Sequence, residues 1–295
     1  MNSAGRPLLG GIEAGGTKFV LAVGHSPTEI IARHEIPTRD PATTLEHVCD
    51  WIEGQGTINA LGIASFGPVE LDRSSTLWGH ITNTPKPAWT NCDLVGHFAE
   101  RFGVPIGFDT DVNGAALAEY EHGAGKAAGS LAYITVGTGI GGGLVFHGKA
   151  IHGAAHPEMG HIFPRRHADD DQFEGICPHH GDCLEGLASG PAIKARWGAS
   201  LSELPSDHIA HAIIADYLAQ LAHSIVAMTA VEIIVLGGGV MRTHGLLERV
   251  NQSATELGAA YFPGGSKHKI VSPGLGHNAG LAGALMLANA VQPDH

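Results

Sequence analysis

Basic residues are scarce in this chain. Its 295 residues include 17 lysines and arginines against 29 aspartates and glutamates, which gives a formal net charge of −12 with histidine neutral. The basic residues form no dense run, so the electrostatic footprint of a nucleic-acid-binding face is missing. We therefore expect no binding to DNA or RNA.

Long apolar runs are missing as well. No stretch reaches the ~18 consecutive apolar residues that a membrane-spanning helix needs. Residues 1–7 lead directly into an apolar strand signal, without the pattern of a secretory signal peptide. We expect a cytoplasmic protein that does not contact a membrane. Cysteine is sparse, with four residues, and these should stay reduced in that compartment.

The standard nucleotide fingerprints are absent from the sequence, since it has neither a Walker A motif nor a dinucleotide motif that opens a long helix. Glycine, by contrast, is abundant at 42 residues. A glycine-rich hairpin signal occurs twice, at 8–22 and 132–146, each time as an apolar strand, a Gly/Thr turn and a second apolar strand. Glycine allows positive φ and has no Cβ, so peptide N–H groups and the hydroxyls of Thr17 or Thr138 can approach a polyphosphate.

One glycine-rich turn is more often an ordinary hairpin than a ligand site. Two copies, each opening roughly one half of the chain, predict a duplicated ATPase with nucleotide and sugar bound in a cleft between the halves. The predicted fold is therefore α/β, of the duplicated actin-like (ribonuclease H-like) type. We expect an N-terminal α/β domain at 1–113, onto which a C-terminal helix at about 279–295 packs back. We expect a C-terminal α/β domain at 114–278, with an insert at about 156–185.

Apolar periodicity supports this class, because strand and helix signals alternate along the chain. The expected strands outside the hairpins are 30–36, 60–65, 105–108 and 232–236, and the expected helices are about 43–54, 93–102, 207–229 and 279–291.

A candidate catalytic carboxylate follows the apolar strand at 105–108. Asp111 comes just before a helix of small residues, for which Asn113 is a plausible N-cap. Ligand clefts in α/β sheets lie at such strand ends. Phosphoryl transfer to a sugar hydroxyl uses a carboxylate that orients the hydroxyl and accepts its proton. Asp111 is our candidate base, and a simple helix-capping function for Asp109 or Asp111 is the alternative.

Cysteine and histidine gather in one short segment. Cys177, His180 and Cys183 form a Cys-x2-His-x2-Cys core with His161 upstream, a ligand set typical of a tetrahedral structural zinc. His179 competes with His180 for the fourth position. Four protein ligands leave no open coordination site, so we expect the zinc to be structural.

The insert around these ligands is rich in aspartate and histidine. Its acidic run, Asp169 to Asp171, could be mistaken for a magnesium site. Charge runs of this kind are usually solvated, and we interpret 165–174 as a solvated loop.

These motifs, taken in order, resemble the ROK family (repressors, open reading frames and sugar kinases), and within it the zinc-containing bacterial fructokinases. The resemblance covers essentially the whole chain. It rests on EAGGTK at 13–18, ASFGP at 64–68, TNTPKPAW at 82–89, DTDVN at 109–113, GTGIGGG at 137–143, HPEMGH at 156–161 and CPHHGDCLEG at 177–186.

The resemblance implies a function for each matching position. It makes Asp111 the catalytic base. It places the phosphates at Gly15, Gly16, Thr17, Lys18, Thr138 and Gly139, with Gly237 and Gly238 as plausible adenosine-side residues. It places the sugar near Asn83, Asn113, Glu158, His161 and Glu185. His161 could serve both sites, because one imidazole nitrogen can bind zinc while the other faces outward.

The activity that the resemblance implies is ATP-dependent phosphorylation of D-fructose to fructose 6-phosphate, with ATP, Mg²⁺ and structural Zn²⁺ as cofactors and a homodimer as the expected assembly. Mannose, glucose or an N-acetylhexosamine could replace fructose, because the hydrogen bonds that distinguish hexoses cannot be seen in one sequence. The choice between ATP and GTP, the oligomer interface and regulation are open for the same reason.

Two hypotheses for another kind of function, a transcription regulator and a zinc hydrolase, have less support. Sugar-responsive repressors of the family carry a helix-turn-helix domain before the first glycine-rich loop, and here seven residues precede Leu8. A zinc hydrolase would need an open ligand position, which a closed Cys/His set does not supply.

Overall fold

The computed structural model describes residues 6–170 and 172–292, which form two compact units. Of these residues, unit 1 contains 6–118, 150–156 and 277–292, and unit 2 contains 119–149 and the remainder of 157–276. The domain boundaries that the sequence suggests, after residues 113 and 278, stay a prediction.

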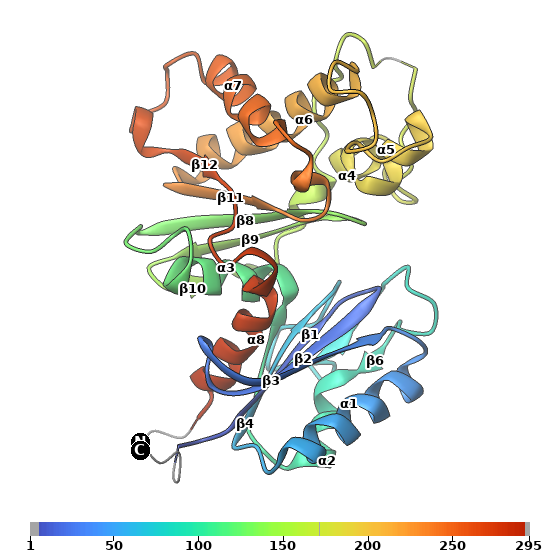
Figure 1. The fold of residues 1–295 in the computed structure, drawn as a ribbon, viewed down its shortest axis with the longest axis vertical. Helices are drawn as coiled ribbons and strands as arrows, with labels where there is room; N and C mark the ends of the chain where they lie inside the picture. Colours follow the sequence, from blue (N-terminus) through green and yellow to red (C-terminus); the bar gives the residue numbers. More distant parts are fainter. Residues whose placement is uncertain (1–5, 171, 293–295) are drawn as a thin grey trace. The chain divides into compact units, whose positions relative to one another are not determined.

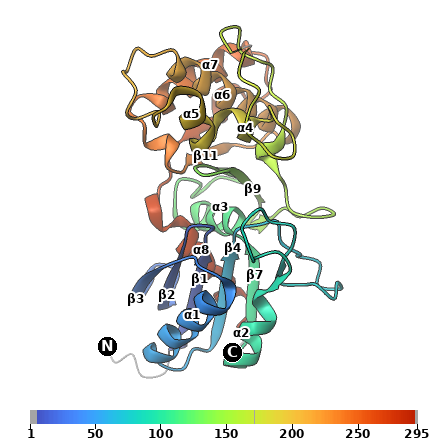
Figure 2. The same ribbon diagram turned by 90° about the vertical axis from the view of Figure 1, so that its right-hand side faces the viewer.

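Unit 1 is built on a five-stranded sheet. Its strands are β1 (Leu9–Ala14), β2 (Lys18–Ser26), β3 (Glu29–Pro37), β4 (Ala60–Ser65) and β7 (Ile106–Thr110). The first glycine-rich signal forms the antiparallel hairpin β1–β2, and the strand order is β3-β2-β1-β4-β7, as Figure 2 shows. β1, β4 and β7 are parallel, with Ala14 beside Ser65 and Ser65 beside Thr110. Their carboxyl ends therefore share one edge.

Helices cover both faces of this sheet. One face carries α1 (Pro41–Gln55) and α2 (Leu94–Phe102), and the other carries α8 (Ala279–Ala290), as seen in Figure 1. Asp40 caps α1 by accepting a hydrogen bond from the Thr43 N–H. α8 approaches the sheet closely, because a Cβ at Gly62 would lie 1.8 Å from the carbonyl oxygen of Ala284. β5 (His80–Ile81) and β6 (Cys92–Asp93) form a small separate sheet.

Helix α3 (Asp111–His122) begins directly after β7. The Thr110 hydroxyl accepts a hydrogen bond from the Asn113 N–H at 3.1 Å, so Thr110 caps this helix. The expectation that Asn113 is the N-cap is wrong: Asn113 lies inside the first turn, and its side-chain amide binds Asp109 instead. The end of α3, from Glu119 onward, belongs to unit 2.

Unit 2 repeats the sheet topology. Its strands are β8 (Ser130–Val136), β9 (Ile140–Phe146), β10 (Lys149–Ala150), β11 (Ile233–Gly237) and β12 (Lys269–Val271). The second glycine-rich signal forms the antiparallel hairpin β8–β9, and the order β10-β9-β8-β11-β12 has the parallel strand β11 beside β8. Both units thus begin with a hairpin whose first strand pairs in parallel with a later strand, which is the architecture of a duplication.

The core of unit 2 lies between this sheet and its helices. The helices are α4 (Leu184–Ala188), α5 (Gly190–Trp197), α6 (Ala210–Thr229) and α7 (Leu246–Gly258). Short 3₁₀ turns are η1 (Met159–His161), η2 (Val240–Arg242), η3 (Gly265–Lys267) and η4 (Gly276–Asn278). The boundary between the two units in the sequence falls within η4. Helix α6 contributes the largest share of buried side chains, among them Tyr217 and Leu218 at 0% exposure.

Helix α6 is long and apolar enough to cross a membrane by length and composition. Its apolar residues are interrupted by polar ones such as Asp216, Gln220 and His223, so it is not a continuous apolar run of the kind that the sequence was expected to lack. Half of its most apolar window is buried, and its apolar residues pack in the core of unit 2. A core helix passes the same composition test as a membrane span, and the packing assigns α6 to the core.

The acidic insert is not wholly solvated as expected. Asp170 is fully buried and forms ion pairs with Arg196 and Arg166, and the Tyr217 hydroxyl donates a hydrogen bond to its carboxylate. Burial raises the pKa of Tyr217 to about 12, so this hydroxyl stays a donor. Asp169 is exposed, as expected, and Asp171 lies outside the described residues.

The expected elements agree with those observed. Outside the two hairpins, the largest difference in a boundary of the strands and helices expected from apolar periodicity is three residues, at the start of α6, which was expected at 207 and begins at 210. Helix α7 was not expected, although Leu246, Val250 and Leu257 recur at helical spacing along the segment 246–258.

Candidate functional site

The carboxyl edge of the parallel strands in unit 1 carries most of the predicted residues of that unit. The turn at 15–17 follows β1, the loop at 66–69 follows β4, and Asp111 follows β7. Because the three strands run side by side in register, these segments share one edge of the sheet. Ligand sites of α/β sheets lie at this edge.

The first glycine-rich turn is held in place by its own backbone. The Gly15 N–H donates to the Lys18 carbonyl at 3.0 Å, and the Thr38 hydroxyl donates to the Gly15 carbonyl at 2.7 Å. A Cβ at Gly15 would lie 2.7 Å from the Lys18 oxygen, whereas the space beside Gly16 is open. Thr17 and Lys18 are exposed, and the Lys18 amine pairs with Glu35 at 2.8 Å. The turn is therefore rigid, with open space at Gly16 and Thr17.

A carboxyl group with an unusually high pKa lies just before this turn. Burial raises the pKa of Glu13 to about 7, against the smaller opposing effect of the Lys18 charge. Its side chain lies against the start of α8, where a Cβ at Gly280 would be 2.4 Å from Glu13 Oε1. Glu13 therefore changes its charge close to neutral pH.

The junction of β7 and α3 holds the predicted base. Asp111 is half-buried in the first turn of α3, and its Oδ1 accepts a hydrogen bond from the Val112 N–H at 2.9 Å. Asp109 is 5% exposed, and its Oδ1 accepts from the Thr110 N–H and from Asn113 Nδ2, both at 2.7 Å. Asn113 is fully buried, and within the described part of the chain its Oδ1 has no hydrogen-bond partner. The Asp109 carboxylate thus holds the Thr110 backbone and the Asn113 side chain in place at this junction.

A histidine that the sequence did not single out as a site residue completes this network. His152 Nε2 lies 2.9 Å from Asp109 Oδ2 and 3.2 Å from Asn113 Nδ2. The hydrogen bond to Asp109 raises the pKa of the His152 imidazole above its ordinary value. The signal that could have found His152 is the pattern His-x3-His at 152–156, whose second histidine opens the HPEMGH motif.

The other predicted residue of unit 1, Asn83, lies in an exposed loop after β5. The loop is ordered by its neighbours: the Thr90 hydroxyl donates to the Thr84 carbonyl, and the fully buried Trp89 donates its indole N–H to the Arg39 carbonyl at 2.8 Å. Asn83 therefore projects from a well-anchored loop.

In unit 2 the second glycine-rich turn is fixed by a helix and a carboxylate. The Gly190 N–H, at the start of α5, donates to the Gly137 carbonyl at 2.7 Å. Glu185 Oε2 accepts from the Ile140 N–H at 2.8 Å, and a Cβ at Gly139 would lie 2.6 Å from that oxygen. Thr138 is exposed at the tip. Glu185, predicted to contact sugar, thus also supports the turn.

The glycines after β11 lie at the same edge of the sheet of unit 2 as this turn, because β8 and β11 are parallel. Gly238 has φ +93°, and a Cβ there would lie 2.4 Å from the Val136 carbonyl oxygen. A Cβ at Gly237 would lie 2.7 Å from the Tyr133 hydroxyl. Only glycine fits at 238, which keeps the backbone of the two loops close together.

Glu158 and His161 lie at either end of η1. His161 Nε2 is 3.8 Å from Glu158 Oε2, while His161 Nδ1 faces the cysteines. η1 packs on β9, where a Cβ at Gly160 would lie 1.9 Å from the Ile140 carbonyl oxygen. The two nitrogens of His161 thus face different groups, as the two predicted functions of this residue require.

The predicted zinc ligands converge. One ligand atom each from His161, Cys177, His180 and Cys183 lies within 4.8 Å of all the others. His161 Nδ1 is 3.3 Å from His180 Nδ1 and 3.5 Å from Cys183 Sγ, and Cys177 Sγ is 3.7 Å from His180 Nδ1. Tetrahedral zinc with ordinary Zn–N and Zn–S bonds places its ligand atoms about 3.3–3.8 Å apart.

These distances, and the Cys₂His₂ chemistry, fit zinc. The cluster takes its second histidine from His180, and His179 supplies no ligand atom to it. The hairpin 177–181 closes through reciprocal backbone hydrogen bonds between Cys177 and Gly181, whose φ is +60°.

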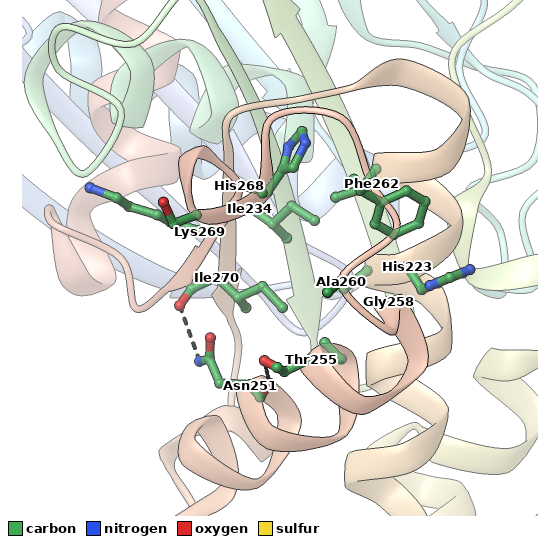
Figure 3. Close-up of a pocket in the computed structure, with 15 residues that line it drawn as sticks. His223, Ile234, Asn251, Thr255, Gly258, Ala260, Phe262, His268, Lys269 and Ile270 are labelled. Atoms are coloured by element: carbon green, nitrogen blue, oxygen red, sulfur yellow. Dashed lines mark hydrogen bonds between the residues drawn. The ribbon is translucent and has the colours of Figure 1, made fainter.

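A cavity of about 440 Å³ lies elsewhere in unit 2, under the segment 258–268. Figure 3 shows its wall, with Ile234, Ile270 and Phe262 among the side chains around it. Its lining includes none of the residues that we predicted to bind nucleotide, sugar or metal.

Comparison with known proteins agrees with these observations. The model of the ROK family matches residues 9–291. The fructokinase of Zymomonas mobilis is 49% identical over 295 residues, which cover 97% of this chain and 98% of that protein. The fructokinase of Pediococcus pentosaceus is 40% identical over 288 residues, which cover 96% of this chain and 98% of that protein.

The solved structures agree as well. The ROK hexokinase from Thermus thermophilus superimposes with a TM-score of 0.77 at 25% identity, covering 96% of this chain and 98% of that one. Together with the repeated strand order, this confirms the expected duplicated actin-like ATPase fold. The match over nearly the whole length, with the motifs on ordered loops of both units, shows that the chain belongs to the ROK family.

Proposed function

We propose that this protein is a fructokinase, which transfers the γ-phosphoryl group of ATP to the 6-hydroxyl of D-fructose. The observation that carries the proposal is its identity of 49% and 40%, over nearly the whole chain, to relatives that are themselves named fructokinase. The reaction leaves ADP and fructose 6-phosphate.

Asp111 is the proposed catalytic base. Its position in the first turn after β7, at the carboxyl edge of the sheet of unit 1, supports this assignment. The hydrogen bond from the Val112 N–H orients the carboxylate at the edge of the sheet. As the bond to phosphorus forms, the Asp111 carboxylate accepts the proton of the sugar hydroxyl.

The glycine-rich turns are the proposed phosphate contacts. Gly16 and Thr17 in unit 1, and Thr138 and Gly139 in unit 2, present peptide N–H groups and hydroxyls from rigid turns. Gly15 belongs to the proposed phosphate loop as the residue that closes its turn, because its own N–H donates to the Lys18 carbonyl. Lys18 would release Glu35 to reach a phosphate, which costs little because this ion pair is exposed. We assign the adenosine side to Gly237 and Gly238. Mg²⁺ would screen the charge of the nucleotide phosphates when bound.

The sugar contacts are proposed from the polar residues of each unit. Asn83 in unit 1, and Glu158, His161 and Glu185 in unit 2, offer amide and carboxylate groups suited to several hydroxyls. Asn113 is fully buried, and its side-chain oxygen, which has no hydrogen-bond partner among residues 6–170 and 172–292, is the feature that supports a contact with a hydroxyl donor.

We propose a structural zinc at His161, Cys177, His180 and Cys183. The ion would tie η1 to the hairpin 177–181 and complete a tetrahedral shell with these four ligands. Through His161 it would also hold the segment that carries Glu158. Chemistry at the metal is not part of the proposal, because four protein ligands leave no open position.

We also propose a cytoplasmic homodimer, as the family resemblance implies. Exposed apolar side chains in unit 2, namely Phe163 at 66% and Ile176 at 40%, support a contact surface there. Size-exclusion chromatography with light scattering distinguishes the dimer from the monomer.

The experiment that tests the function follows ADP release with fructose, ATP and Mg²⁺ for the wild type and for Asp111→Asn. We expect turnover by the wild type and a loss of about 10²–10⁴-fold in kcat for the variant, the usual contribution of a general base. Circular dichroism establishes that the variant is folded. A folded Asp111→Asn enzyme with undiminished kcat would refute the assignment of the base.

A further inference from the structure

The pair formed by Asp109 and His152 has no task in the function proposed so far. Asp109 is 5% exposed, whereas the His152 side chain is 39% exposed. A buried carboxylate thus holds an imidazole that is partly open to solvent. The two residues are 43 positions apart in the sequence, at 2.9 Å between Oδ2 and Nε2.

The direction of this hydrogen bond follows from the neighbouring groups. Asp109 Oδ1 accepts from Asn113 Nδ2, so its carboxylate is an acceptor with both oxygens engaged. We assign the proton to His152 Nε2, because an unprotonated nitrogen would face a carboxylate oxygen at 2.9 Å. The approach of Asn113 Nδ2 to the same nitrogen at 3.2 Å is then a contact between two donors rather than a hydrogen bond. The ring is fixed with Nε2–H toward Asp109. Its Nδ1 has no partner among the described residues of the chain.

The segment that carries His152 is placed by two histidines. Residues 150–156 belong to unit 1, although the chain on both sides belongs to unit 2. His152 binds Asp109 near the end of β7, and His156 Nε2 accepts from the Val69 N–H at 3.2 Å in the loop after β4. β4 and β7 are neighbours and parallel, so both anchors lie at the carboxyl edge of the sheet. Asp111 and the turn at 15–17 follow strands that end at the same edge.

We propose that His152 is a further substrate-contacting residue of the kinase reaction, with Asp109 as its positioning residue. The proposal rests on the proposed function. His152 Nδ1–H donates a hydrogen bond to an oxygen of the substrates, either a sugar hydroxyl or the phosphoryl group in transfer. Asp109 supports this donor in two ways: it fixes the ring, and its negative charge favours the protonated imidazole, which carries N–H on both nitrogens.

A structural or metal-binding explanation accounts for less. A purely structural histidine is usually buried with its polar atoms satisfied, whereas His152 is 39% exposed and binds through one nitrogen. His152 also stands outside the group of metal-ligating side chains found among the described residues.

The test compares His152→Ala and His152→Gln with His25→Ala. His25 is a matched control, because it is a part-buried histidine of unit 1 with one hydrogen bond, from Nδ1 to the Pro7 carbonyl. His25 follows Gly24, which pairs with Leu9 at the start of β1. It therefore lies at the edge of the sheet opposite to the one that carries Asp111 and the turn at 15–17. KM for fructose, KM for ATP and kcat are measured by ADP release at fixed pH.

Loss of a hydrogen bond from a charged donor corresponds to roughly tenfold to hundredfold in affinity. We expect His152→Ala to change one constant by about that factor, with partial recovery in His152→Gln and no change in His25→Ala. A rise in KM for fructose identifies a sugar hydroxyl as the acceptor. A rise in KM for ATP, or a fall in kcat with both KM values kept, identifies the phosphoryl group. Wild-type constants in His152→Ala would overturn the proposal.

Asp109→Asn tests the positioning. If Asp109 acts through His152, the double variant with His152→Ala loses no more activity than the more severe single variant. Additive losses would overturn the positioning assignment. Failure of the proposed function is distinct from both results, because it would appear as a wild-type enzyme without fructose turnover.

Discussion

The substitution Glu13→Gln should make the chain more stable at pH 8 than the wild type. Burial raises the pKa of Glu13 from 4.5 to about 7 in the folded state, and the unfolded chain has the ordinary value. Below pH 4.5 both states hold the proton. Between pH 4.5 and 7 the unfolded chain has lost its proton while the folded chain keeps it. The free energy of unfolding therefore falls as pH rises through this window and levels off above pH 7.

The size of the effect follows from the difference of 2.5 pKa units between 4.5 and 7. At 1.36 kcal/mol per unit, the wild type loses about 3 kcal/mol of stability across the window. Glutamine has nearly the same shape and stays neutral, so the variant escapes this loss. We expect the two chains to differ by less than about 1 kcal/mol at pH 5 and by about 3 kcal/mol at pH 8.

Urea unfolding at pH 5, 6, 7 and 8 measures this difference. Tryptophan fluorescence reports mainly on unit 1, which contains three of the four tryptophans, among them Trp89, fully buried against Phe19 and Phe66. Glu35→Gln is the control, since hydrogen bonding to Lys18 lowers the pKa of Glu35 and its titration falls below the window. A difference between Glu13→Gln and wild type that is the same at pH 5 and pH 8 would refute the argument.

Three further predictions concern the packing of glycines, the metal cluster and a buried carboxylate. Gly62→Ala should destabilise unit 1 by about 3 kcal/mol or more in urea unfolding, because its Cβ would lie 1.8 Å from the Ala284 carbonyl oxygen. Gly54→Ala in α1 is the control: a Cβ there has no atom within 4 Å, and the change should stabilise the chain by about 0.5–1 kcal/mol. Chelation of zinc, or Cys183→Ser, should lower the melting temperature and fructose turnover together, and turnover lost at an unchanged melting temperature would contradict a structural zinc. Glu119→Gln should cost about 1–3 kcal/mol in urea unfolding, because the buried carboxylate accepts three backbone N–H groups that glutamine cannot all satisfy.

Much of the fold could be predicted because its signals are local. The two glycine-rich hairpins are written in short stretches of sequence, and the paired strands follow directly from them. The cluster at His161, Cys177, His180 and Cys183 could be predicted for a similar reason, since three of its four members lie within one short loop.

The pairing of Asp109 with His152 could not be predicted from the sequence. His152 belongs to a short segment, 150–156, that is part of unit 1 although the residues before and after it in the sequence belong to unit 2. A histidine in a polar insert has the local pattern of a solvated residue. Asp170 was misjudged for the same reason: its run of aspartates is polar, but its partners Arg196 and Tyr217 come from later helices. Long-range partners, rather than local composition, decide whether a charged residue is buried.

Composition also misleads in the other direction. Helix α6 is apolar enough to resemble a membrane span, yet its side chains fill the core of unit 2. Helix α7 is polar on average, but its apolar residues recur at helical spacing and pack against the core of unit 2, so its amphipathic pattern is the signal that could have found it.

The most direct test of the central claim is kcat/KM for the wild-type enzyme, loaded with zinc, against fructose, glucose, mannose and N-acetylglucosamine, with ADP release as the signal. We expect the highest value for fructose. A higher value for another hexose would keep the kinase and replace the substrate, and no turnover with any of the four sugars would contradict the proposed function.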